Sequence, residues 1–210
     1  MSCTPTCCRA DAPDSVAESV SSPLRLRVSA TAESLLRRGH PWLFDKSIRS
    51  QNRAGNMGDL AVIYDRNDRF LAIGLYDPES PIRVRLLHAG KPVKIDAAWW
   101  QARLDAALQR RAGLFDETTT GYRCINGESD GWPALVLDRY DATLVLKLYS
   151  AIWFKCLNNI LEIIRASVPC ERIVLRLSRN IRSAAETFDL ADGQIIHGPA
   201  ITSPVTFLEN

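Results

Sequence analysis

Cysteine and histidine are the residue types in this chain that could bind a metal ion or act as nucleophiles, so their spacing is informative. The 210 residues include six cysteines and three histidines. Three cysteines lie before residue 23 and three stand singly along the rest of the chain: Cys3, Cys7, Cys8, Cys124, Cys156 and Cys170. No CxxC pair occurs, and the histidines lie far apart at His40, His88 and His197. Because zinc ligands usually come in closely spaced pairs, the sequence predicts reduced thiols and no metal site.

A second group that could do chemistry is an acidic turn between two glycines, Gly127 and Gly131. It contains Glu128, Ser129 and Asp130. Carboxylates in such a turn could bind a metal or transfer a proton. An isolated acidic turn more often reflects the conformational needs of the turn alone. We therefore expect no catalytic residue here, and an enzyme that uses this turn is kept as an alternative.

Positive charge is concentrated near the start of the chain. The net charge is +2, but residues 23–95 contain 13 lysines and arginines against 7 acidic residues. The stretch 25–53 is the most basic part of this segment. Cations that neutralise phosphates release counterions and supply most sequence-independent affinity for nucleic acid. The pattern therefore indicates a polyanion as partner, with the solvated surface of a mildly basic domain as an equally open alternative.

The candidate RNA contacts cluster around a predicted turn between a short helix and a strand. They are the cations and the histidine of this region: Arg37, Arg38, His40, Lys46, Arg49 and Arg53. Cations at a helix C-terminus also interact favourably with the helix dipole, which would explain Arg37 and Arg38 without RNA. Trp42 could stack on an unpaired base, although we expect it to be buried in the core of a small domain.

Alternating hydrophobic residues from residue 24 to residue 89 predict a compact, mostly β unit with one helix. LRLRV forms the first strand, and Thr31 is the expected N-cap of a helix that Gly39 ends. Trp42 and Phe44 should share one face of the next strand, with Leu43 on the other. A hairpin around residues 65–69 and the strand IRVRLLHAG complete the unit.

The following segment reads as a second, α+β unit. Asp96 is a plausible N-cap for a long helix, and a hairpin is expected around residues 139–141. Ser150 precedes an amphipathic helix, followed by the strand ERIVLRLS. A strand that starts at Thr206 would have no evident partner, which predicts that the natural protein continues beyond Asn210. Residues 1–22 have no periodicity and are expected to be a disordered tail.

The order of GHPWLFDKSI, GDLAVIYDRNDRFLAIGLYD, IRVRLL, NGESDGWPALVLDRY and the terminal FLEN resembles the PUA-domain-containing class I SAM-dependent 23S rRNA (cytosine-C5) methyltransferase family. The resemblance runs from about Leu24 to Asn210, and NGESDGWPALVLDRY carries most of it. It implies an α+β chain with a PUA-like small β-barrel that binds RNA over residues 23–92. A middle α+β domain would span residues 93–205, and residues 206–210 would begin a Rossmann-like methyltransferase domain that is absent from this chain.

The function that the resemblance implies is that of an RNA-binding, substrate-positioning portion that is inactive alone. The chain has no Gly-rich strand-to-helix loop followed by an acidic residue, and no cysteine matches the family's nucleophile. S-adenosylmethionine is therefore implied for the full-length family member and not for this chain, and no catalytic, cofactor or metal residue is carried over. A free-standing RNA-binding adaptor is the alternative.

The sequence and the resemblance also set expectations for partners and location. Ribosomal RNA is the expected partner, and whether the chain forms a homodimer is left open. No apolar run reaches the roughly 18 residues that cross a bilayer, and the N-terminus lacks a signal-peptide h-region. We therefore expect a cytoplasmic protein with no membrane contact.

Overall fold

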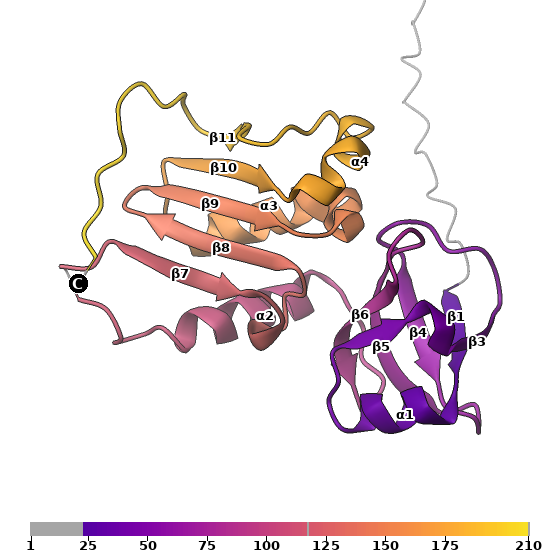
Figure 1. Ribbon diagram of the computed structural model, residues 1–210. Helices are drawn as coiled ribbons and strands as arrows, with labels where there is room; N and C mark the ends of the chain where they lie inside the picture. Colours follow the sequence, from indigo (N-terminus) through magenta and orange to yellow (C-terminus); the bar gives the residue numbers. More distant parts are fainter. Residues whose placement is uncertain (1–22, 117, 210) are drawn as a thin grey trace, which may run out of the picture.

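The computed structural model describes residues 23–116 and 118–209, so the expected tail at residues 1–22 lies outside the described residues, as do Cys3, Cys7 and Cys8. The described chain forms two β-sheets, joined by the segment between β6 and α2 (Figure 1). The fold is therefore mixed α and β, as predicted. No helix among the described residues is long and apolar enough to cross a bilayer.

The first sheet is curled and has six strands in the order β2-β6-β5-β4-β1-β3 (Figure 1). All its pairings are antiparallel except that of β1 with β4. Its elements are β1 (Leu24–Val28), α1 (Ala30–Arg37), β2 (Trp42–Phe44), β3 (Ile48–Gln51), β4 (Leu60–Tyr64), β5 (Phe70–Tyr76) and β6 (Ile82–Ala89). The alternation of β1 is clean: Leu24, Leu26 and Val28 are buried, and the two arginines between them are exposed.

The start of α1 differs from the prediction by two residues. Ser29 is the N-cap, and its hydroxyl oxygen accepts a hydrogen bond from the backbone N–H of Ala32 at 3.3 Å. Thr31 lies inside the first turn and is exposed. Both residues are good caps in isolation, and Ser29 takes the role because β1 ends at Val28. Gly39 ends the helix as expected, with a φ of +87°.

The expectation of a buried Trp42 is wrong. Leu43 is the residue of β2 that enters the core, with 1% of its surface exposed, while Trp42 is half-buried and Phe44 is 40% exposed. The reason is that β2 is an edge strand whose inner face points Leu43 at the small core of the curled sheet. Trp42 instead points out of this core and donates its indole N–H to Glu128 of the second unit at 3.1 Å.

The second sheet has five strands in the order β11-β10-β9-β8-β7, and among its described pairings that of β9 with β10 alone is parallel. Helices α2 and α3 contact each other and pack on the same face of this sheet (Figure 1). Its elements are α2 (Ala97–Gln109), β7 (Gly121–Asn126), β8 (Leu135–Tyr140), β9 (Thr143–Leu148), α3 (Leu157–Ser167), β10 (Arg172–Leu177), α4 (Arg182–Glu186) and β11 (Ile195–His197). Asp96 caps α2 as predicted, accepting from the N–H of Trp99 at 3.0 Å.

Two details of the second unit differ from the sequence interpretation. The helix after Ser150 begins as a 3-10 helix, Ala151–Cys156, before it continues as α3. Its first four residues are all buried, which one face of an α-helix cannot achieve. Residues 207–209, the described residues after Thr206, form no strand, yet they do have a partner: the carbonyl of Leu208 accepts from the N–H groups of Thr120 at 2.8 Å and Gly121 at 2.9 Å.

The two units share a hydrophobic core. Leu75 of β5 and Leu87 of β6 belong to the first sheet, yet they pack in the same buried cluster as three tryptophans of the second unit, Trp100, Trp132 and Trp153. The indole rings of Trp100 and Trp132 lie 5.0 Å apart, and those of Trp100 and Trp153 lie 5.4 Å apart. Burial of such large side chains on both sides of the junction joins the units into one structure.

Candidate nucleic-acid interface

The structure divides the six predicted RNA contacts into two groups. Arg37 forms ion pairs with Glu33 at 3.2 Å and Asp65 at 2.8 Å, and Arg53 pairs with Asp59 at 2.8 Å. The Nδ1 atom of His40 lies 3.2 Å from the backbone N of Trp42. These three side chains therefore have structural contacts within the protein. The others are exposed and form no ion pair among the described residues: Arg38, Lys46 and Arg49.

The six residues do not form a single patch. Lys46 and Arg49 lie close together on either side of Ser47, whose carbonyl accepts from the N–H of Ser29 at the start of α1. Arg38 lies beyond the opposite end of this helix, about 12 Å away at 1.5 Å per residue. Arg53 lies at the junction with the second unit, because its partner Asp59 also binds Lys155 at 3.2 Å.

Two arginines missing from the candidate set extend the surface around Lys46 and Arg49. Arg25 and Arg27 are the exposed residues of β1, which pairs with β3 where Arg49 occupies a bulge. The guanidinium of Arg25 lies 5.7 Å from the centre of the Tyr64 ring. Arg27 pairs with Asp68 at 2.8 Å, but both side chains of this pair are exposed, unlike Asp65 and Asp59, which are buried, so the pair is open to solvent and to competition by phosphate. The pattern LRLRV, in which both arginines face solvent, is the signal that identifies them. We call Arg25, Arg27, Lys46 and Arg49 the basic face.

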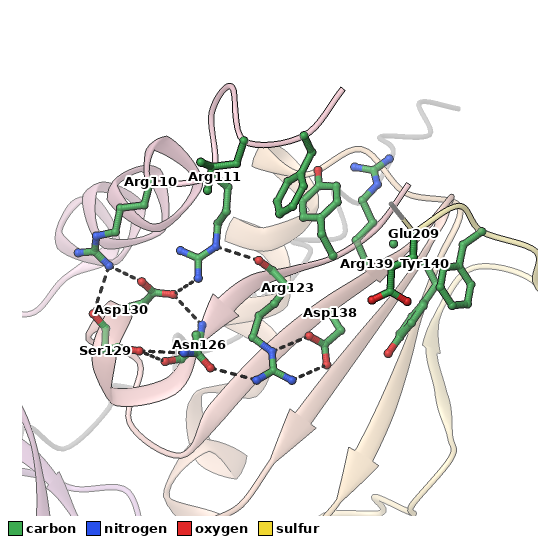
Figure 2. Close-up of a pocket in the computed structure, with 15 residues that line it drawn as sticks. Arg110, Arg111, Arg123, Asn126, Ser129, Asp130, Asp138, Arg139, Tyr140 and Glu209 are labelled. Atoms are coloured by element: carbon green, nitrogen blue, oxygen red, sulfur yellow. Dashed lines mark hydrogen bonds and ion pairs between the residues drawn. The ribbon is translucent and has the colours of Figure 1, made fainter. Parts of the chain in front are cut away.

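The acidic turn is the joint between the two units. It forms a short 3-10 helix, Gly127–Asp130, after β7. Glu128 accepts from the indole of Trp42 and pairs with Arg85 of β6 at 3.3 Å. Asp130 is buried and pairs with Arg110 and with Arg111, the latter at 2.7 Å (Figure 2). Both carboxylates are thus engaged in structural contacts.

The electrostatics of Asp130 also argue against a role in proton transfer. Burial alone would raise the pKa of this carboxyl group, but hydrogen bonds from Arg111 and from the N–H of Asn126, with the charges of the arginines, lower it below its usual value. A carboxyl group with a lowered pKa stays ionised at neutral pH and is a poor general acid or base. The enzyme that uses this turn as its catalytic site therefore has no support in the geometry.

The thiols of the described residues are not activated. Burial raises the pKa of Cys124 to about 11 and that of Cys156 to about 11, and burial also raises the pKa of Cys170. A thiol is nucleophilic as its thiolate, so these groups are unreactive at neutral pH. Among the described residues, no three His, Cys, Asp or Glu side chains gather as a metal-ligand set.

The crossover from β9 to β10 does not offer the open space that an adenosyl cofactor usually occupies. Such a cofactor needs space at the carboxyl end of a parallel strand, usually beside a Gly-rich turn into a helix. The crossover from β9 to β10 is where this space would lie, and it is filled: Ser150 is 3% exposed, and Ile152 and Trp153 are fully buried. Ser150 also donates its hydroxyl proton to Asp77 of the first unit at 3.1 Å.

Comparisons with known proteins define the class of the first unit. Residues 26–89 match the family described as a PUA-like domain. The match runs from the middle of β1 to the end of β6 and therefore includes nearly all of the curled sheet and three of the four residues of the basic face, all but Arg25. The chain thus contains a PUA-like domain.

Relatives extend the comparison to the second unit. The chain is 56% identical over 192 residues to the "Ribosomal RNA large subunit methyltransferase" of Deinococcus radiodurans, covering 89% of this chain and 47% of that protein. It is 34% identical over 176 residues to the "Ribosomal RNA large subunit methyltransferase I" of Alteromonas mediterranea, covering 83% of this chain and 44% of that protein. The chain spans about half the length of the curated relatives it matches.

Solved structures support the same fold. A putative SAM-dependent methyltransferase from Streptococcus mutans superposes with a TM-score of 0.72 at 17% identity, over 89% of this chain and 46% of the other. A putative methyltransferase complexed with SAH gives a TM-score of 0.73, with the same identity and coverage. The fold of the two units therefore corresponds to about half the length of each of these larger proteins.

Proposed function

We propose that the chain is the RNA-binding and substrate-positioning portion of a SAM-dependent enzyme that methylates C5 of a cytosine in large-subunit ribosomal RNA. The observation that carries this proposal is the 56% identity to a ribosomal RNA large subunit methyltransferase over 89% of the chain. The PUA-like match over residues 26–89 supports a role in RNA binding. In this proposal the chain is cytoplasmic, and S-adenosylmethionine belongs to the full-length protein.

The proposal assigns a part to each segment of the chain. Residues 23–92 form the RNA-binding domain, residues 93–205 form a middle domain, and residues 206–210 begin the methyltransferase domain. The basic face would hold phosphates, and the shared core would transmit that position to the rest of the enzyme. No step of methyl transfer is assigned to the described residues, because their thiols stay protonated and the β9 crossover is filled.

Charge reversal on the basic face tests RNA binding. The double variant Arg25→Glu and Arg49→Glu should weaken binding to large-subunit rRNA fragments by tenfold or more, measured by filter binding at low salt, because two phosphate contacts become repulsive. Arg38→Glu tests the far end of α1 separately. Arg165→Glu on α3 is the matched control, since Arg165 is also exposed and lies in the second unit. Equal weakening by the control would contradict an RNA site on the PUA-like domain.

A free-standing RNA-binding adaptor is the second candidate. The observation that favours it is that the described residues contain neither an activated thiol nor space for the cofactor at the parallel crossover. The two candidates differ in the coding sequence expected downstream of Asn210. A Gly-rich adenosyl-binding domain would support the enzyme portion, and a stop codon would favour the adaptor. Sedimentation equilibrium of the chain with RNA would show whether one copy or a homodimer binds.

A further inference from the structure

A pocket of about 810 Å³ opens beside β7, the edge strand of the second sheet (Figure 2). Its walls come from residues 110–115 after α2, from β7, the acidic turn and β8, and from Phe207 and Glu209. Gly121 allows the last segment to lie close against β7, because a Cβ at this position would collide with the ring of Phe207. The hydrogen bonds from Thr120 and Gly121 to Leu208 fix this wall in place.

The pocket contains one arginine, Arg139, whose side chain has no polar partner among the described residues. Four arginines and three carboxylates line it. Arg110 and Arg111 share Asp130, and Arg123 pairs with Asp138 at 2.8 Å. Arg139 has no hydrogen-bond or ion-pair partner for its side chain among the described residues, and Figure 2 shows its guanidinium apart from the Arg123–Asp138 pair. A half-buried, unpaired arginine in a pocket is suited to an anionic ligand group.

Aromatic rings line the same pocket. Phe115 and Tyr122 are stacked, with ring centres 4.5 Å apart, and Phe115 is 40% exposed. On the other side, Tyr140 and Phe207 meet at 4.9 Å, and Phe207 is 38% exposed. Exposed rings beside an unpaired arginine are what single-stranded RNA requires, because unpaired bases stack on aromatic faces while cations hold the phosphates.

The pocket continues toward the PUA-like domain. A neighbouring pocket of about 450 Å³ shares Arg123, Asn126 and Ser129 with it, and reaches Arg85 of β6 and Tyr149. The Nε atom of Arg85 is buried and has no hydrogen-bond partner among the described residues. The two pockets adjoin at Arg123, which lies on the opposite face of the sheet from the paired residues Tyr122 and Arg139. Together they form a groove that passes from the PUA-like domain around the edge strand β7 to Arg139.

We propose that this groove binds a single-stranded RNA segment, with Arg139 at a phosphate and the Phe115–Tyr122 stack as a platform for a base. The proposal rests on the proposed function in that the ligand is RNA. It adds a second contact site, on a unit to which the PUA-like match does not extend. A strand held at both sites would run across the joint formed by Glu128, and its direction would then be fixed relative to both units.

The test is fluorescence anisotropy with labelled octauridylate, a single strand that cannot form a duplex with itself. Arg139→Glu and Phe115→Ala should each weaken its binding by roughly tenfold, the effect expected for loss of one phosphate contact or one stacked base. Arg165→Glu should leave the affinity unchanged. Because Phe115 and Arg139 are both partly exposed, circular dichroism should show that these variants fold.

A second measurement separates this inference from the proposed function. Octamers that contain 4-thiouridine should crosslink to peptides spanning residues 110–126 of the wild-type chain. If octauridylate binding falls in Arg25→Glu with Arg49→Glu but not in Arg139→Glu or Phe115→Ala, and crosslinks map to the PUA-like domain alone, the groove is not an RNA site while the proposed function stands. If neither octauridylate nor rRNA fragments bind the wild-type chain, both proposals are overturned.

Discussion

At the scale of single residues, two buried carboxylates each form ion pairs with two basic side chains. Asp59 is 8% exposed and binds both Arg53 and Lys155, and Asp130 is 3% exposed and binds both Arg110 and Arg111. Burial alone would raise the pKa of Asp59, yet hydrogen bonds from Asn56, Arg53 and Lys155 lower it. Each carboxylate thus holds two cations in ion pairs within the protein and neutralises one of their two positive charges.

Because the pKa of Asp130 is lowered in the folded protein, the free energy of unfolding should decrease at acidic pH. A carboxyl group whose pKa is depressed in the folded state stabilises the protein above its unfolded pKa of about 3.9, and this contribution is lost as pH falls through the folded value. Asp130→Asn should lower the free energy of unfolding by about 1.5–3 kcal/mol at pH 7 and flatten its decline below about pH 4. Urea unfolding at several pH values measures both effects.

The control for this prediction is Asp105→Asn, which replaces an exposed carboxylate on α2. It should leave the unfolding free energy at pH 7 within about 0.5 kcal/mol of the wild type. An unchanged acid profile in Asp130→Asn would show that the Asp130 ion pairs contribute nothing to folding.

The buried thiols give a prediction about reactivity. With a pKa of about 11, Cys124 is ionised at pH 7.5 in roughly one molecule in three thousand, so iodoacetamide should modify it very slowly in the folded protein. Peptide mapping after timed alkylation measures the rate, and the same chain in guanidinium chloride is the reference. Fast alkylation of Cys124 in the folded chain would reveal an activated thiol and contradict the absence of a catalytic cysteine among the described residues.

At the scale of elements, the N-cap of α1 can be tested directly. Ser29→Ala removes the hydroxyl that accepts from Ala32, so it should cost about 1 kcal/mol of stability. Thr31→Ala, which changes an exposed residue within the helix, should change stability by less than about 0.5 kcal/mol. Urea unfolding of the two variants measures both effects. A larger loss of stability in Thr31→Ala than in Ser29→Ala would show that Thr31 is the N-cap.

Much of the element order can be predicted from local patterns, and the exceptions have identifiable causes. Alternation predicts β1, and the cap at Asp96 predicts α2, because both depend on neighbouring residues. The partner of Leu208 and the roles of Glu128 and Trp42 depend on pairings across 86 or more residues, which local periodicity does not encode. Periodicity also does not encode which carboxylate a cation pairs with, so the sequence could place cations near a turn but not show that Asp65 and Asp59 bind Arg37 and Arg53.

At the scale of the whole molecule, the shared core predicts that both units unfold together. Leu87 is 5% exposed and contributes from β6 to the core of the second unit. Leu87→Ala should cost about 2–5 kcal/mol and shift one common transition. Tryptophan fluorescence and far-ultraviolet circular dichroism should give the same urea midpoint, because most of the tryptophans lie in the second unit while both units contribute to the dichroism.

Hydrogen exchange provides the check on this prediction. Amides of β4 in the first sheet and of β9 in the second should lose protection to the same extent in Leu87→Ala. Loss of protection in one sheet alone would mean that the units fold independently. The PUA-like domain could then move freely, and it would not position a substrate for another domain.

The salt dependence of RNA binding tests the central claim most directly. If the four cations of the basic face each contact a phosphate, the logarithm of the association constant for a single-stranded rRNA fragment should fall with the logarithm of salt concentration with a slope of about −3 or steeper. Arg25→Glu with Arg49→Glu should make the slope shallower by about 1.4. An affinity independent of salt, or a slope that this double variant leaves unchanged, would contradict phosphate binding by the PUA-like domain.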